Sequence, residues 1–244
     1  MTTGIIIGLM AIVLIIVVVY RKRIVIGQTN HVPADWPKIT DIEPDSAVSF
    51  GYKCVWFAVR TDNKNRLAEV FALKDIFDCN WKIGIDRAYN DAVFITPTID
   101  NWTLAVGWGL PYDDGENGIE KVKDALQTLS KEFGEAQFFC THRVSEYHCW
   151  MKAANGDIVR IYNFLGEAGG NTRVEGKPTE FEQTLKLANT LSDEAKDPKY
   201  FDDKDLIWPD EDLVMQIAGH WSIDPTQLEF RQDIMPGLGL LGRR

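Results

Sequence analysis

The pattern of apolar and polar positions points first to a strand meander in the middle of the chain. Residues 134–166 hold the densest apolar and aromatic material outside the N-terminus. Strands are predicted there at Ala136–Thr141, Glu146–Ala153 and Ile158–Leu165. Between the last two, Asn155-Gly156 accepts positive φ at both centres of a tight hairpin turn. We therefore expect this meander at the centre of a sheet on which helices pack.

Further elements are predicted on both sides of the meander. Aromatic and β-branched runs favour strands at Ser49–Arg60, Ala92–Thr96 and Asn101–Trp108. Helical spacing favours four helices: a short one after Thr61 or Asp62, a long one over 119–133 with Gly134 as C-cap, one from Thr179 to about Leu191, and one from Asp210. Thr179 and Glu182 form a capping box. Residues 78–90 are ambiguous, with a short helix around Trp81 and Ile85 as one interpretation.

This order of elements predicts the fold class. Strands come in neighbouring pairs instead of alternating with helices, which favours an α+β fold with a largely antiparallel sheet and flanking helices. We predict one soluble domain over residues 45–230, entered through a proline-containing linker at 24–44. Residues 231–244 are predicted to be a flexible tail.

The N-terminus predicts a membrane anchor over residues 1–23. Gly4–Tyr20 carries no charged residue and is long enough to cross a hydrocarbon core of about 30 Å as a helix. A cleaved signal peptide fits poorly, because no basic region precedes the apolar run and no small-residue cleavage site follows it. Arg21, Lys22 and Arg23 follow directly, so the positive-inside rule places the N-terminus outside the bacterial inner membrane. The soluble domain is then expected in the cytoplasm after a single membrane pass.

The charge of the remaining chain narrows the class of partner. The full chain has a formal charge of −10, with 26 basic and 36 acidic residues. Without the three basic residues at 21–23, the count is 23 against 36, a charge of −13. Such a domain repels phosphate backbones, so we expect no nucleic-acid partner. The acidic surface suits a basic protein partner, although solubility alone is the commoner explanation.

The sequence gives only weak support for catalytic residues. His142, Glu146 and His148 would share one face of a continuous strand, but the two histidines would then lie about 20 Å apart, too far for one metal ion. We therefore expect no metal site, and the sequence holds no signature of a cofactor or small-molecule ligand. The four cysteines have no CxxC or zinc spacing and favour buried, inert thiols, although two disulfides stay possible if the topology differs; they are Cys54, Cys79, Cys140 and Cys149.

Candidate binding residues cluster around loops. Trp102 and Trp108 lie next to turn residues, where an aromatic side chain can form part of an exposed binding surface. Asp113 and Asp114 belong to an acidic turn before the long helix, whose spacing does not match a calcium loop. For each tryptophan taken singly, packing in the core is the more frequent role.

Three stretches resemble a family of uncharacterised bacterial proteins loosely associated with toxin–immunity systems: Val93–Pro111, Thr141–Glu167 and Asp210–Leu228. The resemblance implies a protein-binding domain without assigned catalytic residues. We therefore expect a membrane-anchored cytoplasmic immunity protein that neutralises a basic toxin. The alternatives are an enzyme with a site near the hairpin of His142 and His148, and a scaffold subunit of an envelope complex whose anchor makes helix contacts through Gly4 and Gly8.

Overall fold

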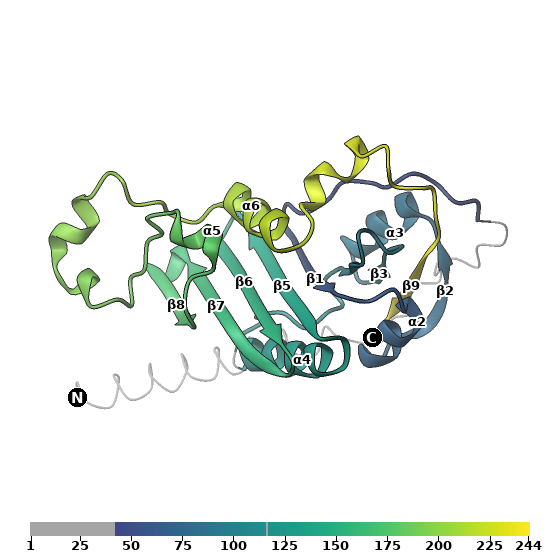
Figure 1. Cartoon of the computed structure of the whole chain (residues 1–244), viewed down its shortest axis with the longest axis horizontal. Helices are drawn as coiled ribbons and strands as arrows, with labels where there is room; N and C mark the ends of the chain where they lie inside the picture. The colour runs from purple at the N-terminus through teal and green to yellow at the C-terminus, as the bar shows by residue number, and fades with distance from the viewer. Residues whose placement is uncertain (1–41, 116) are drawn as a thin grey trace, which may run out of the picture. The chain divides into compact units, whose positions relative to one another are not determined.

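A nine-stranded antiparallel sheet is the framework of the computed structural model, which describes residues 42–115 and 117–244 (Figure 1). The strand order is β2-β9-β3-β4-β1-β5-β6-β7-β8. The α+β class with an antiparallel sheet is confirmed. The strands are β1 (Cys54–Val59), β2 (Lys74–Cys79), β3 (Val93–Ile95), β4 (Thr103–Val106), β5 (Glu135–His142), β6 (Tyr147–Ala154), β7 (Asp157–Leu165), β8 (Gly170–Glu175) and β9 (Gly239–Arg243).

Helices cover both faces of this sheet. One face packs against α2 and α4, and the other against α3, α5 and α6, which lie in front of the sheet in Figure 1. The helices are α2 (Lys64–Val70), α3 (Trp81–Ala88), α4 (Gly118–Phe133), α5 (Glu180–Gln183) and α6 (Glu211–Trp221), with short 3-10 helices η1 (Gly166–Ala168), η2 (Glu194–Lys196), η3 (Pro198–Asp202) and η4 (Pro225–Phe230).

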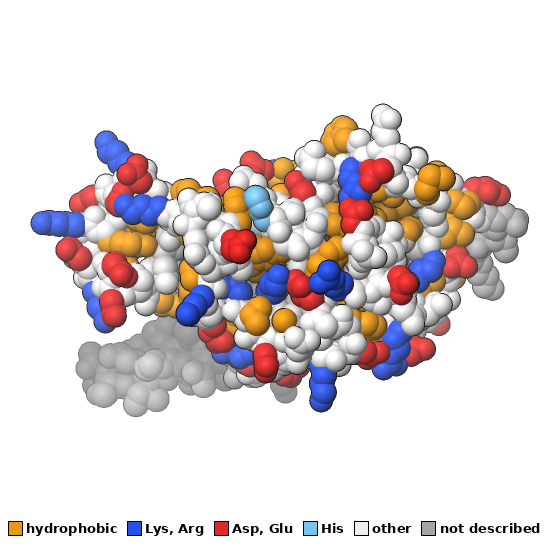
Figure 2. Space-filling view, viewed as in Figure 1, with side chains coloured by type: hydrophobic (Ala, Val, Ile, Leu, Met, Phe, Trp, Pro, Cys, Tyr) orange, Lys and Arg blue, Asp and Glu red, His pale blue; other side chains and the backbone are white. Residues whose placement is uncertain are grey.

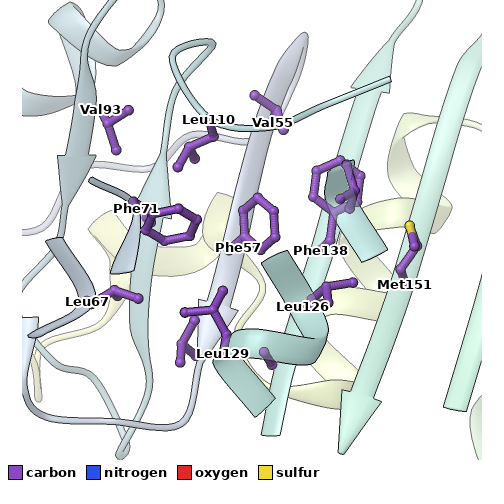
Figure 3. Packing of buried hydrophobic residues seen from close by; sticks show 14 of the residues in the cluster. Val55, Phe57, Leu67, Phe71, Val93, Leu110, Leu126, Leu129, Phe138 and Met151 are labelled. Atoms are coloured by element: carbon purple, nitrogen blue, oxygen red, sulfur yellow. The ribbon is translucent and has the colours of Figure 1, made fainter. Parts of the chain in front are cut away.

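The central strand β1 is apolar throughout because it is buried on both faces of the sheet. Side chains alternate between the two faces of a strand, and both faces are buried here. Phe57 faces α4 and lies between Phe71 and Phe138, with ring centroids 5.2 and 5.0 Å away (Figure 3). Its neighbour Trp56 faces the other side and stacks on Phe139 at 5.1 Å. Both layers of the core therefore meet at β1.

Local sequence signals explain the turns and helix ends. Asn155 and Gly156 have φ of 52° and 93°, as a tight hairpin turn requires, and they join β6 to β7. Asp210 caps α6 by accepting a hydrogen bond from the Leu213 N–H at 2.8 Å. The capping box at Thr179 is present, but α5 ends at Gln183 instead of near Leu191. The ambiguous stretch 78–90 contains the end of β2 and helix α3, capped by Asn80.

The predicted flexible tail at 231–244 is wrong. Gly239–Arg243 forms β9, which pairs with β2 on one side and β3 on the other. Leu241 is fully buried there. The pairing is antiparallel on both edges, so the last strand of the chain joins β2 to the rest of the sheet.

The predicted fold class also needs a correction in its membrane part. No helix within residues 42–115 and 117–244 is long and apolar enough to cross a bilayer. The described helices bury one face and carry charges on the other, as the 16-residue α4 does with Glu120 and Lys131. Gly4–Tyr20, on which the transmembrane prediction rested, lies outside the described residues.

Candidate functional site

Two cavities flank the turn between β5 and β6. In this hairpin, His142 pairs with Tyr147 and Thr141 pairs with His148. Because facing residues of an antiparallel pair point to the same side, His142 and His148 project from opposite faces of the sheet. Each histidine lines one cavity.

The structure separates His142 from Glu146 and His148, which were candidates for one catalytic site. Residues 143–146 form the turn of the hairpin, so no continuous strand carries the three side chains. Glu146 and His148 line one cavity, while His142 lines the other with Trp108 and Asp113. No single catalytic centre joins the three side chains.

The cavity on the α4 side, here called the aromatic pocket, has a volume of about 560 Å³. Trp108 and Tyr112 meet edge to face, with centroids 5.1 Å apart and ring planes at 82°. The His142 ring lies 6.4 Å from Trp108. The pocket is lined by Trp108, Tyr112, Asp113, Gly115, Cys140, His142, Ser145, Tyr147 and Leu165.

Asp113 provides the charge of the aromatic pocket. Its Oδ2 accepts hydrogen bonds from Asn163 Nδ2 at 3.3 Å and from the Tyr147 hydroxyl at 3.5 Å. Burial, together with the neighbouring thiols and Asp113, raises the pKa of Tyr147 well above its usual value, so the phenol stays protonated and donates. Within the described residues, Asp113 forms no salt bridge.

The cavity on the other face, here called the acidic groove, has a volume of about 670 Å³. It lies where α6 begins, beside the start of β6. Four carboxylates and one guanidinium line it, so its charge is negative. The groove is lined by Tyr52, Arg143, Glu146, His148, Phe164, Trp208, Pro209, Asp210, Glu211 and Asp212.

Hydrogen bonds hold the side chains of the acidic groove. Glu211 accepts from Arg143 Nε at 2.7 Å and from the Lys53 N–H at 3.1 Å. The Tyr52 hydroxyl donates to Asp212 at 2.8 Å, and this bond raises the pKa of Tyr52. The Arg143 guanidinium lies 5.8 Å from the centre of the Tyr52 ring. These contacts fix an aromatic wall beside carboxylates.

His148 forms the buried end of the acidic groove. Its Nδ1 lies 3.1 Å from the Thr141 hydroxyl. Burial lowers the pKa of His148, against the opposing effect of Asp210, Glu211 and Glu146. The ring is therefore neutral at pH 7.

The predicted binding residues are only partly brought together. Trp108 and Asp113 share the aromatic pocket. Trp102 is instead buried beside the β3–β4 loop, where the Arg60 guanidinium lies 6.0 Å from its ring. Asp114 is exposed and pairs with Lys121 at 3.1 Å.

The cysteines and the possible metal ligands of the described residues bear on the chemistry of these cavities. The four cysteines are free and buried, and burial raises the pKa of the Cys140 thiol well above its usual value. A thiol held protonated is a poor nucleophile. Within residues 42–115 and 117–244, no group of three His, Cys, Asp or Glu side chains could hold a metal ion. The arrangement is suited to recognition of a cation or a basic surface.

Several residues that line the cavities were interpreted from the sequence only as parts of helices, strands or loops. Asp210, Glu211 and Asp212 indicated a helix start, and they also line the acidic groove. Trp208 lies in a proline-punctuated connection without a periodic pattern. Tyr52 and Tyr147 come from stretches predicted as strands, and the sequence pattern does not show which cavity each one lines.

No protein-family model, curated protein or solved structure matches this chain. The resemblance to a family associated with toxin–immunity systems therefore stays a prediction.

Proposed function

We propose that this domain binds a basic protein partner through the acidic groove. The observation that carries the proposal is the combination of exposed aromatic side chains and carboxylates around one cavity. Trp208 is 42% exposed and Tyr52 40%, and both line the groove with Glu146 and Asp210–Asp212. Large aromatic side chains supply most of the binding energy of protein interfaces, and charges of one sign speed the encounter with an oppositely charged partner.

The surroundings of the groove extend this apolar surface. Phe201 stacks near Trp208 with ring planes at 18°, and Phe164 packs edge to face against Trp208 at 5.9 Å. Val144, at the tip of the β5–β6 turn, is 69% exposed. Figure 2 shows hydrophobic side chains between charged ones over the face that carries α5 and α6. Such a mixed surface is typical of a non-obligate protein interface.

The sequence resemblance implies the kind of partner. If the resemblance to a family associated with toxin–immunity systems holds, the partner is a toxin. The domain then neutralises this toxin by covering a basic surface. An enzyme near the β5–β6 hairpin has less support, since His142 and His148 lie on opposite faces and Cys140 is held as a thiol.

Site-specific photocrosslinking in cells of the source organism tests the proposal. A photoreactive phenylalanine derivative at Val144 is expected to crosslink to a basic protein. The same derivative at Phe230 is the matched control, because Phe230 is 68% exposed and its neighbour Arg231 pairs with Asp100, at the opposite end of the strands. Adducts of the same protein from both positions, or none from Val144, would contradict the proposal.

A further inference from the structure

We propose that the aromatic pocket binds a small organic cation, with an ammonium or guanidinium group on an apolar body. This inference goes beyond the proposed protein partner and does not depend on it. It rests on three features of the pocket: the arrangement of its rings, the state of its carboxylate and its size.

The rings form adjoining walls. Trp108 and Tyr112 stand nearly perpendicular, with centroids 5.1 Å apart, and His142 adds a third ring 6.4 Å from Trp108. Aromatic faces attract a cation within about 6 Å of the ring centre, and indole does so most strongly. An ammonium or guanidinium group can therefore contact more than one ring in this pocket.

Among the described residues, no cationic side chain forms a salt bridge with the Asp113 carboxylate. Asn163 and Tyr147 both donate to Oδ2, which orients the group, but within the described residues no Lys or Arg side chain pairs with it. Glu211 in the acidic groove differs, because Arg143 compensates it at 2.7 Å. A partly buried charge is costly unless it is paired, so a cationic ligand would supply the missing partner.

The volume of the pocket favours a small molecule over a single side chain. A cavity of about 560 Å³ falls within the range of pockets that hold drug-sized ligands, roughly 300–1,000 Å³. Leu165 and the buried Cys140 add apolar surface beside the rings. The ligand is therefore expected to carry an apolar body next to its cationic group.

Calorimetric titration of the full-length protein tests this assignment with two pairs of probes. Choline is compared with neutral 3,3-dimethylbutanol, and butylguanidinium with neutral butylurea. We expect saturable binding of at least one cation, at least about tenfold tighter than its neutral counterpart. Trp108→Leu and Asp113→Asn should each weaken that binding about tenfold, because one removes the ring face and the other the charge.

Matched variants keep the test decisive. Asp113→Asn retains an oxygen that accepts from Asn163, and the thermal unfolding of each variant shows whether it folds. Trp208→Leu removes an indole from the acidic groove and should leave cation binding unchanged. Equal binding of cation and neutral probe, no binding of either cation, or equal losses in Trp108→Leu and Trp208→Leu would overturn the proposal. Binding of an arginine- or lysine-containing peptide with neither free cation bound would also overturn it, since the occupant would then be a protein side chain.

Discussion

Burial controls the protonation of Cys54, Cys79 and His148. Desolvation raises the pKa of the Cys54 and Cys79 thiols to about 12, and it lowers the pKa of His148. Neutral forms are therefore favoured at all three positions at pH 7. His148 is the member of this set that titrates within the physiological range when it is exposed.

The His148 imidazole should make folding depend on pH. Its folded-state pKa lies below the unfolded value of about 6.5, so the unfolded chain binds the proton more readily in the interval between the two. The contribution of His148 to the free energy of unfolding should then be constant above pH 6.5. It should fall as the pH drops toward the folded-state pKa, by at most about 1.4 kcal/mol per pH unit. Urea unfolding between pH 7.5 and 5.5 measures this loss.

A matched histidine variant separates the contribution of this residue. His148→Gln should reduce the loss on acidification, because no imidazole must then stay neutral inside the fold. His220→Gln, which removes the imidazole stacked on Phe181, should keep the loss. Identical pH dependence in the wild type and in His148→Gln would show that His148 does not titrate differently on folding.

A buried ion pair attaches α5 to the sheet. Arg160 on β7 donates through Nε to Glu182 Oε1 at 2.8 Å, and both side chains are almost completely buried. The Trp150 indole donates to the same oxygen at 3.0 Å, while the Thr179 N–H and hydroxyl each donate to Oε2 at 2.8 Å. One carboxylate thus joins β6, β7 and the start of α5.

Breaking this pair should be more damaging than removing it. Glu182→Leu leaves a buried guanidinium without its partner and is expected to cost about 3–5 kcal/mol of unfolding free energy. The double variant Arg160→Met/Glu182→Leu should lose less than Glu182→Leu alone, because no unpaired charge stays buried. Chemical denaturation measures both, with Glu180→Leu on the exposed side of α5 as control. A double variant as unstable as the sum of its single variants would show that the two side chains act independently.

The strand β9 connects the edge strand β2 to the rest of the sheet. It lies between β2 and β3, whose residues are more than 140 positions earlier in the chain, so this part of the sheet forms only after distant segments meet. Leu241 on β9 pairs with Phe77 on β2 and Phe94 on β3, and its side chain is fully buried.

Leu241→Ala should therefore destabilise the domain by about 2–5 kcal/mol, as expected for a cavity in a packed core. Leu191→Ala is the matched control, because the same atoms are removed from a side chain that is 58% exposed, and its effect should stay within about 0.5 kcal/mol. Urea unfolding curves of the two variants give the comparison. Equal, small effects would mean that β9 contributes as little as a mobile tail.

Features that depend on neighbouring residues could be predicted from the sequence, whereas features that depend on contacts between distant segments could not. The meander and its Asn155-Gly156 turn were predictable because turn chemistry and strand pattern are local. β9 was not, since Gly239–Arg243 is short, contains two glycines and lacks β-branched residues, and its stability comes from distant partners. In the site, Trp108 and Asp113 were found as loop residues, whereas the separation of His142 from His148 depended on hairpin register.

A protein-binding role for the acidic groove is best tested by the affinity of the crosslinked partner for purified variants. Trp208→Ala should weaken binding at least about tenfold, since an exposed aromatic side chain at the centre of an interface is a typical hot spot. Phe230→Ala should bind like the wild type, and rising salt should slow association because the groove is acidic. Equal affinities for wild type, Trp208→Ala and Phe230→Ala, with no dependence on salt, would contradict a protein-binding role for the acidic groove.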